Sequence, residues 1–372
     1  MPAPRRIIFW QPIDSPHQDA FLEAVAEQFP GEVILGVERP FAPERAAQGW
    51  PAPQHSLVKV VNISSPANHA ALAAHTGPDS LHVFSGFFSH PLVWSGFRSL
   101  APSQAKLAIY SEAPEQPPLT GWLKRLRGRW LAARWSSRVA FVLAVGGIGC
   151  EFFSAIGFPK SKIIPFGYYV AETPAPAAQR EHDGVFRFIS AGQLIHRKGI
   201  DLLIRACATL PQTGWQLDVY GDGPERPSLE RLSSSLQLSD RISFRGTLPN
   251  DRLRAAIAAA DCAVLPSRFD GWGMLVNEAL AVGTPIICTS ACGSASILNQ
   301  IPAPESPGRK PRDEPHPQIA LPTPAALAGS LTHALRLGPP PHALRIALAA
   351  AVRERGSAKA AARRFLSAIS VA

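Results

Sequence analysis

The stretch of sequence that decides the fold spans residues 266–286 and reads PSRFDGWGMLVNEALAVGTPI. The apolar segment ADCAVLPS that leads into it is typical of a buried strand. Gly271 and Gly273 follow as a turn where the backbone can approach a ligand closely. From Met274 the apolar spacing is helical until a Gly-Thr-Pro sequence ends it. The stretch predicts a strand, a glycine turn and a helix N-terminus, whose free N–H groups favour an anion such as phosphate.

Two carboxylates belong to this stretch. Asp270 precedes the helix, and Glu278 lies inside it. A carboxylate beside a phosphate site is poorly suited to bind phosphate, but it is suited to accept hydrogen bonds from the hydroxyls of a sugar and a ribose. The alternative is a buried strand–helix unit with a solvated acid at each end.

A second stretch, residues 190–206 (SAGQLIHRKGIDLLIRA), has the same strand–loop–helix character. Gly192 opens its loop, and Lys198 lies at the start of its helix. A lysine at a helix N-terminus commonly neutralises a phosphate. The alternative is a solvated surface lysine.

Strands alternate with helices along most of the chain, which indicates parallel sheets with helices on both faces. Residues 171–184 and 302–318 are rich in proline and lack periodicity, and we interpret them as an interdomain linker and a mobile insertion. The expected fold is α/β, with two doubly wound Rossmann-like domains, 1–172 and 183–354, facing a ligand-binding cleft. The C-terminal helix, about 355–372, is a candidate to pack back on the first domain.

The composition limits the classes of partner. The 372 residues are 46% hydrophobic and carry a net charge of +9, which suits a globular protein with an anionic partner. The basic residues are not interleaved with an RNA-binding aromatic motif, so no nucleic acid is expected. The five cysteines form no C-x-x-C pair, which favours free thiols in a reducing compartment. The N-terminus has neither a signal peptide nor a membrane span, so we expect a cytoplasmic protein.

The order of motifs resembles a known family. Gly-x5-Lys-Gly is followed by Val-x-Gly-x-Gly-Pro, by Arg-Ile-Ser-Phe-x-Gly, and by Pro-Ser-x-x-acid-Gly-x-Gly with Glu-Ala-Leu-Ala. This order resembles the retaining glycosyltransferases of the GT-B fold (glycosyl transferases group 1), strongly over 185–300 and more loosely over 1–170. The resemblance implies transfer of a hexose from a nucleotide-sugar, which is a substrate and not a cofactor. The acceptor would be a saccharide or lipid-linked saccharide in cell-surface polysaccharide or glycolipid synthesis. No Asp-x-Asp metal motif accompanies the cleft motifs, consistent with a metal-independent enzyme.

Carried over by position, the resemblance assigns Lys198 to the donor diphosphate, Glu278 to the ribose and Asp270 to the transferred sugar. Backbone amides from Gly273 onward would cap the phosphates, and the backbone near Gly246 would meet the base. The full donor-side set is Gly192, Gln193, Arg197, Lys198, Gly246, Thr247, Leu248, Asp270, Gly271, Trp272, Gly273, Met274, Leu275 and Glu278.

The chain departs from the family pattern at two of these positions. Gln193 stands where the family usually has Arg, so one phosphate-binding cation is missing unless Arg197 or another group replaces it. Asp270 stands where the family has Glu, one methylene longer. These departures keep two alternatives open: a nucleotide-sugar epimerase or hydrolase of the same fold, and an inactive nucleotide-sugar-binding scaffold.

Three residues of the first domain are acceptor-side candidates. Glu112, at the end of the strand KLAIYSE, would position or deprotonate the incoming hydroxyl and completes a catalytic set with Asp270 and Lys198. His17 and His90 are further candidates, and the alternative for all three is a loop or helix-start residue without a catalytic role. Ser15 is the expected N-cap of the first helix.

Residues 121–138 (GWLKRLRGRWLAARWSSR) predict a basic amphipathic helix. Its apolar face carries Trp122, Leu123, Leu126, Trp130 and Ala133, and beside that face lie Lys124, Arg127, Arg134 and Arg138. This pattern indicates an anionic membrane surface as a partner, with peripheral attachment at the inner face of the plasma membrane. The alternative is an ordinary domain helix whose arginines snorkel to solvent.

Overall fold

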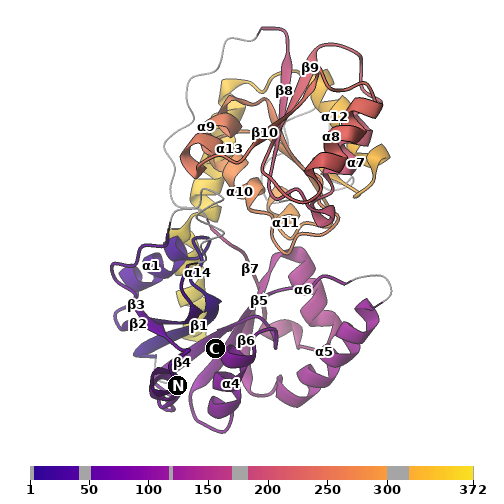
Figure 1. Ribbon diagram of the computed structural model, residues 1–372. Helices are drawn as coiled ribbons and strands as arrows, with labels where there is room; N and C mark the ends of the chain where they lie inside the picture. The colour runs from indigo at the N-terminus through magenta and orange to yellow at the C-terminus, as the bar shows by residue number, and fades with distance from the viewer. Residues whose placement is uncertain (1–3, 42–51, 117–119, 170–182, 300–317, 372) are drawn as a thin grey trace. The chain divides into compact units, whose positions relative to one another are not determined.

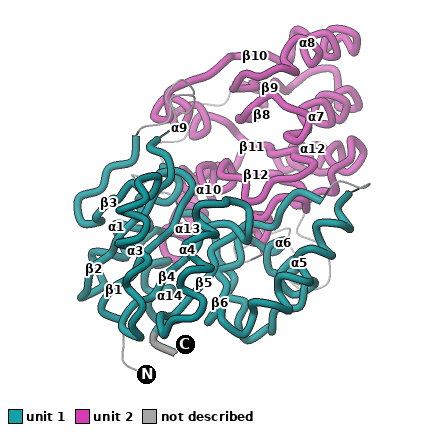
Figure 2. The backbone as a smooth tube through the Cα atoms, turned by 60° about the horizontal axis from the view of Figure 1, so that its bottom comes forward, with its two compact units in different colours: residues 1–171, 357–372 teal, residues 172–356 magenta. Residues whose placement is uncertain are grey.

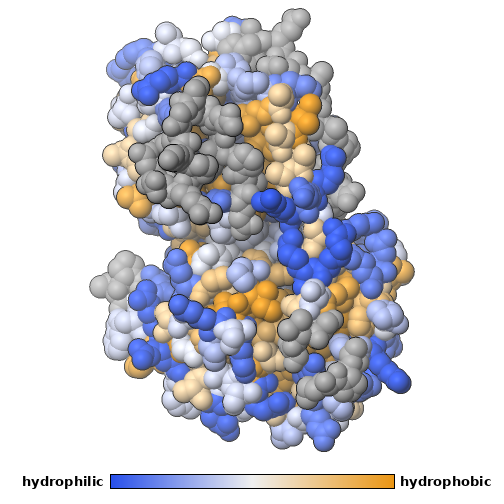
Figure 3. All heavy atoms as spheres, turned by 180° about the vertical axis from the view of Figure 1, so that it is seen from behind, coloured by the Kyte–Doolittle hydropathy of each residue, from blue (hydrophilic) through white to orange (hydrophobic). Residues whose placement is uncertain are grey.

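The computed structural model describes residues 4–41, 52–116, 120–169, 183–299 and 318–371 (Figure 1). The expected linker and Pro-rich insertion fall almost entirely outside these ranges. The chain divides into two compact units, residues 1–171 with 357–372, and residues 172–356 (Figure 2). On the face drawn in Figure 3, hydrophobic residues lie among hydrophilic ones on both units, as is usual for globular proteins.

Unit 1 is built on a seven-stranded parallel sheet of order β3-β2-β1-β4-β5-β6-β7. Its strands are β1 (Arg6–Ile13), β2 (Glu32–Arg39), β3 (Lys59–Asn62), β4 (Ser80–Ser85), β5 (Lys106–Glu112), β6 (Val139–Val145) and β7 (Ile163–Phe166). Its helices are α1 (Asp19–Gln28), α3 (Pro66–Ala73), α4 (Pro91–Leu100), α5 (Gly121–Trp135), α6 (Gly146–Ala155), the 3-10 turn η1 (Lys160–Lys162) and α14 (Ala358–Val371).

Both faces of this sheet are buried. Successive residues of β1 point to opposite faces, and their side chains are packed on each side. On one face, Phe9 packs against Phe365 of α14, with ring centroids 5.7 Å apart, and against Phe21 of α1 at 6.1 Å. On the other face, Trp10 stacks on Phe84 at 5.6 Å. Burying each such side chain contributes about 1.5–3 kcal/mol. The C-terminal helix therefore completes the core of unit 1.

Unit 2 holds a six-stranded parallel sheet of order β10-β9-β8-β11-β12-β13. Its strands are β8 (Phe186–Ala191), β9 (Trp215–Tyr220), β10 (Ile242–Gly246), β11 (Cys262–Leu265), β12 (Ile286–Thr289) and β13 (Ile319–Ala320). Its helices are the 3-10 turn η2 (His196–Lys198), α7 (Ile200–Cys207), α8 (Arg226–Ser235), α9 (Asn250–Ala259), α10 (Met274–Ala281), α11 (Ala295–Leu298), α12 (Pro324–Leu337) and α13 (His342–Gly356). Helix α7 packs against α8 and α12, and α10 packs against α9 and α13.

Each sheet has a point where the strand order reverses. In unit 1 it lies between β1 and β4, and in unit 2 between β8 and β11. Helices that follow the two strands at such a point diverge to opposite faces, which leaves a crevice at the carboxyl ends of the strands. In unit 2 the two loops at this point are the two stretches that the sequence singled out.

The expected start of the first helix is wrong. Helix α1 begins at Asp19 with Gln18 as its N-cap, and Ser15 instead accepts a hydrogen bond from the Gln18 amide through its backbone oxygen, at 2.9 Å. Residues 16–18 form a turn that closes before the helix begins. The expected C-terminal helix, about 355–372, corresponds to α14, which is separated from α13 by a break at Ser357, where the chain passes from unit 2 to unit 1.

Candidate functional site

The loops that follow β8 and β11 are joined by hydrogen bonds. The backbone amide of Arg268 donates to the carbonyl oxygen of Arg197 at 2.9 Å. The Arg268 guanidinium also binds both carboxylate oxygens of Asp201, at 2.6 and 2.7 Å. A Cβ on Gly199 would lie 2.2 Å from the carbonyl oxygen of Pro266, so only glycine permits this approach. The two loops therefore form one rigid surface.

An ion pair lies at the centre of this surface. The ammonium of Lys198 lies 2.5 Å from Oδ2 of Asp270, and the guanidinium of Arg197 lies 3.5 Å from Oδ1. Asp270 is only 7% exposed, so it is not a solvated loop acid. A buried carboxylate needs such partners because its charge has left water. Two cations against one carboxylate leave a surplus positive charge beside the start of α10.

The start of α10 has no side-chain cap. Its N-cap, Gly273, has a φ of 95°, a left-handed conformation that favours glycine. A Cβ there would lie 2.6 Å from the Leu265 side chain. The following residues, Met274 and Leu275, contribute amides to the first turn, where such groups commonly bind an anion.

Glu278 lies in the second turn of α10. It is 7% exposed, and burial raises the pKa of its carboxyl, opposed by the charges of Arg254 and Lys198. Among the described residues, no hydrogen bond reaches this carboxylate. A buried carboxylate with a raised pKa and no hydrogen-bonding partner is a common mark of a binding or catalytic site.

The other donor-side candidates fall into two groups. Gly192 and Gln193 are exposed at the end of β8. Two strands away, Gly246 ends β10, and Thr247 and Leu248 follow it. The Trp272 side chain is buried and donates a hydrogen bond to Oδ1 of Asn277 at 2.7 Å, so its indole supports the turn from within unit 2. The sequence alone did not show that the Trp272 side chain is buried within unit 2, while the glycines on either side form the turn.

The acceptor-side candidates come together in a cavity of about 360 Å³ in unit 1. His17, His90 and Glu112 all line it. The cavity lies at the carboxyl ends of β1, β4 and β5, where the strand order reverses. Burial lowers the pKa of His90, so its imidazole is neutral at physiological pH.

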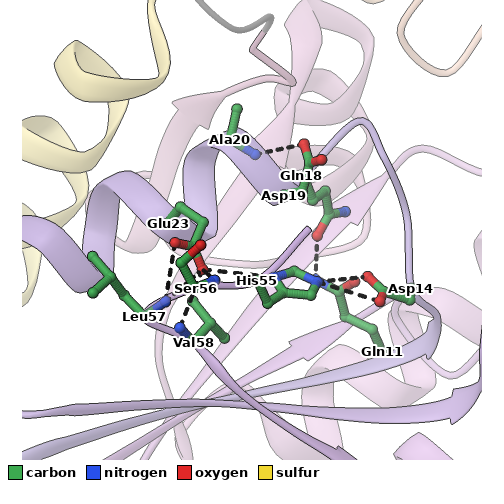
Figure 4. Close-up of polar contacts among 10 residues, drawn as sticks. All are labelled: Gln11, Asp14, Gln18, Asp19, Ala20, Glu23, His55, Ser56, Leu57 and Val58. Atoms are coloured by element: carbon green, nitrogen blue, oxygen red, sulfur yellow. Dashed lines mark hydrogen bonds and ion pairs between the residues drawn. The ribbon is translucent and has the colours of Figure 1, made fainter. Parts of the chain in front are cut away.

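A polar cluster beside this cavity was missed by sequence reasoning (Figure 4). Nε2 of His55 lies 3.0 Å from Oδ1 of Asp14, and this hydrogen bond raises the pKa of His55. The carboxylate of Glu23, on α1, accepts hydrogen bonds from the backbone amides of residues 56–58 at 3.0–3.2 Å. The groups lie on separate segments of the chain, so no local sequence motif predicts the cluster.

Helix α5 presents a large apolar face to solvent. Trp122, Leu123, Leu126 and Trp130 are 61%, 49%, 59% and 66% exposed. The opposite side is packed closely, since a Cβ on Gly128 would lie 2.9 Å from the Ile156 side chain.

The predicted basic residues of this helix do not all lie beside the apolar face. Lys124, Arg127 and Arg134 are exposed, and the Arg134 guanidinium lies 4.3 Å from the centre of the Trp135 ring system. The prediction for Arg138 is wrong. Its guanidinium donates hydrogen bonds to three backbone carbonyls that follow α4, including that of Ser103 at 3.1 Å. This side chain therefore stabilises the fold of unit 1.

Two searches for other kinds of site gave negative results. Within the described ranges, no group of three His, Cys, Asp or Glu side chains is arranged to hold a metal ion. In the same part of the chain, no helix is both long and apolar enough to cross a bilayer. All five cysteines are free, and four of them are buried.

The fold is similar to that of known structures. Across 98% of this chain and 99% of the other, the structure is similar to the lipopolysaccharide outer core galactosyltransferase WaaB, with a TM-score of 0.70 and 16% identity. Across 99% and 100% it is similar to Anabaena HepE in complex with UDP, with a TM-score of 0.72 and 15% identity. The expected GT-B glycosyltransferase fold is confirmed.

A family model matches part of unit 2. Residues 173–300 match the family model "Glycosyl transferases group 1", which is the family that the motifs of this region resemble. The chain is 38% identical over 105 residues to LpsE of Rhizobium meliloti, a lipopolysaccharide core biosynthesis glycosyltransferase, covering 28% of this chain and 30% of that protein. A glycogen synthase of Mycobacterium tuberculosis is 26% identical over 232 residues, 60% of this chain and 55% of that protein. The matches thus span about a third to a half of these relatives.

Proposed function

We propose that this protein is a retaining, metal-independent glycosyltransferase. It would transfer a hexose from a nucleotide-sugar to a saccharide or lipid-linked saccharide in cell-surface polysaccharide or glycolipid synthesis. The observation that carries the proposal is the Lys198–Asp270 ion pair at 2.5 Å, next to a helix start with no side-chain cap and a buried Glu278 that accepts no hydrogen bond from the described residues. This combination offers cations and amides to a diphosphate and carboxylates to hydroxyl groups.

The proposed roles in unit 2 follow from charge and reach. Lys198 and Arg197 neutralise the diphosphate, and the first amides of α10 cap its oxygens. Arg197 thereby replaces the cation that the family usually has at the position of Gln193. Glu278 accepts hydrogen bonds from the ribose, and Asp270 from the hydroxyls of the transferred sugar.

In the proposed reaction, the bond between the anomeric carbon and the donor phosphate breaks, and a bond to the acceptor oxygen forms on the same face of the sugar. Lys198 and the helix N-terminus stabilise the charge that develops on the leaving diphosphate. Because both carboxylates near the donor are assigned to hydroxyls, we favour front-side attack over a covalent intermediate. Glu112, at the cavity of unit 1, would position or deprotonate the acceptor hydroxyl.

We also propose an anionic membrane surface as a partner, with attachment at the inner face of the plasma membrane. The support comes from α5, where two exposed tryptophans and two exposed leucines lie among exposed cations. Aromatic side chains at the interface and cations on lipid phosphates are typical of such helices. A lipid-linked acceptor would suit this location.

The experiment that tests the function has two stages. Nucleoside diphosphates and nucleotide-sugars are screened for thermal stabilisation, because a ligand that binds the folded state raises the melting temperature. Compounds that stabilise the protein are then tested for turnover with and without saccharide acceptors. Sugar release or inversion without acceptor would indicate the hydrolase or epimerase, and stabilisation without turnover would indicate the scaffold.

A further inference from the structure

We infer that His55 is a positioning residue for the cavity of unit 1: in its protonated form it holds the turn at residues 14–18 in the geometry that the acceptor needs. The inference deepens the proposed transferase function and rests on it, because it takes this cavity as the acceptor site. Sugar transfer would then weaken as His55 loses its proton.

The turn at residues 14–18 forms part of the cavity wall. Ser15, His17 and Gln18 line the cavity. Asp14 begins the turn and directly precedes one of these lining residues, but it is not a lining residue itself. A group that fixes Asp14 therefore fixes part of the wall without touching the molecule that occupies the cavity.

His55 contacts Asp14 from a distant segment of the chain. Nε2 of His55 lies 3.0 Å from Oδ1 and 3.3 Å from Oδ2 of Asp14. Nδ1 lies 3.8 Å from Oε1 of Glu23, and Figure 4 shows the imidazole ring between the two carboxylates. Because only 7% of the surface of the His55 side chain is exposed, salt in the solvent screens these contacts little. A protonated imidazole has an N–H donor on both ring nitrogens, whereas a neutral imidazole has one.

The segment that carries His55 is itself fixed to α1. The carboxylate of Glu23 accepts hydrogen bonds from the backbone amides of residues 56–58 at 3.0–3.2 Å. Since Glu23 lies on the helix that directly follows the turn, His55 connects the start of the turn to that helix. At the end of the turn, the side-chain amide of Gln11 donates a hydrogen bond to Oε1 of Gln18. Loss of the His55 contact would therefore release the turn at its start and not at its end.

The charge on His55 depends on pH. The hydrogen bond to Asp14 raises the pKa of the imidazole, and burial opposes the rise. In the described part of the chain, the charged groups that act on His55 are Asp14, Glu23 and Asp19, and all three favour the protonated form. Because the pKa in the folded protein lies above the ordinary value of 6.5, the charged contacts are complete below that pH and weaken as the pH rises through the raised pKa.

The first test measures amide hydrogen exchange of the full chain by mass spectrometry, without ligand, between about pH 6 and pH 9. After correction for the intrinsic pH dependence of exchange, protection of residues 14–23 should fall in the parent as the pH rises. His55→Gln, which keeps a neutral donor, should have the lower protection at every pH. Protection in His55→Gln that equals the parent's at pH 6 would overturn the inference.

His69→Gln is the matched control for this test. His69 is a half-buried histidine of unit 1 whose Nε2 lies 3.0 Å from the hydroxyl oxygen of Ser95, and it is not a lining residue of the cavity. Its substitution should leave the protection of residues 14–23 and its pH dependence unchanged. The same loss of protection in both variants would contradict a specific role of His55.

The second test measures initial rates of transfer to methyl hexosides of gluco, galacto and manno configuration, with UDP-glucose, UDP-galactose or GDP-mannose as the donor. At pH 6, His55→Gln should raise the acceptor KM roughly threefold or more, a typical effect within one hydrogen-bond network, while kcat and the donor KM stay near those of the parent. The acceptor KM of the parent should rise with pH, and that of the variant should change less. Asp14→Asn should act like His55→Gln, and the double variant should be no weaker than either single variant.

The two tests separate the inference from the proposed function. An effect of His55→Gln on kcat alone, or a pH profile equal to the parent's, would overturn the positioning role. Absence of transfer by the parent with every donor would count against the transferase, while the exchange measurement would still decide whether His55 holds the turn.

Discussion

The ammonium of Lys198 and the carboxylate of Asp270 form an ion pair at 2.5 Å, although the two residues are 72 positions apart in the sequence. The sequence assigned one residue to the diphosphate and the other to the sugar. The structure shows that the two groups hold each other, with Arg197 on the second carboxylate oxygen. A substitution at either residue therefore changes the charge environment of the other.

Lys198→Ala should weaken nucleotide-sugar binding by roughly 10- to 150-fold, since a charge-assisted phosphate contact contributes about 1.5–3 kcal/mol. Isothermal titration with the donor measures the change, and circular dichroism checks the fold. Lys160→Ala, an exposed lysine in unit 1, is the matched control. Unchanged affinity in a folded Lys198→Ala protein would remove this lysine from the donor site.

Glu278→Gln should weaken binding of the nucleoside diphosphate itself, because ribose is common to donor and product. Since burial raises the pKa of Glu278, the parent should lose affinity as the pH falls through that raised pKa, while the variant should show a flatter profile. Titration with the diphosphate over a pH series tests both points. Glu230→Gln, on the exposed side of α8, is the control, and a variant that matches it would assign Glu278 to the fold alone.

Binding to anionic vesicles should depend on α5. Arg127 and Arg134 are changed to Gln, while Arg138 is left intact because it holds backbone carbonyls. Vesicle co-sedimentation should fall, and binding by the parent should decline as salt rises, because exposed charges are screened over about 8 Å at physiological ionic strength. The control changes Arg98 and Arg231, both exposed on other helices. Equal vesicle binding by the two double variants would refute the membrane contact.

His82 should make the protein sensitive to acid. Its Nδ1 accepts from the Trp10 indole at 3.0 Å, its Nε2 lies 2.8 Å from the His75 carbonyl, and burial lowers its pKa to about 4. Because the unfolded chain binds this proton more readily, the stabilisation is complete above pH 6.5 and is lost as the pH falls through about 4. Urea unfolding should show a loss on the order of 3 kcal/mol over that window. A His82→Phe variant with the same acid slope as the parent would contradict this.

The sequence signals for the donor-side candidates are local. The glycines and Lys198 lie within single strand–loop–helix units, so spacing alone places them. The acceptor candidates His17, His90 and Glu112 had weaker sequence signals, because they were chosen only from their positions near the ends of predicted elements. In the structure all three line one cavity.

What the sequence could not predict depends on contacts between distant segments. The pairing of His55 with Asp14 and the role of Arg138 arise from groups that only the fold brings together. The predicted start of α1 was wrong because serine is a common N-cap residue, whereas residues 16–18 form a turn and the helix begins only after it.

The central claim is that Asp270 binds the transferred sugar while Lys198 binds the diphosphate. The most direct test is Asp270→Asn, with Asp240→Asn, an exposed acid of unit 2, as its control. Isothermal titration with the nucleoside diphosphate is combined with initial rates of sugar transfer. Because the neutral amide would no longer compete for the lysine, affinity for the diphosphate should stay within a few-fold of the parent or rise, while most transfer activity is lost. Transfer at the parent rate, or loss of diphosphate affinity as large as that of Lys198→Ala, would contradict the account.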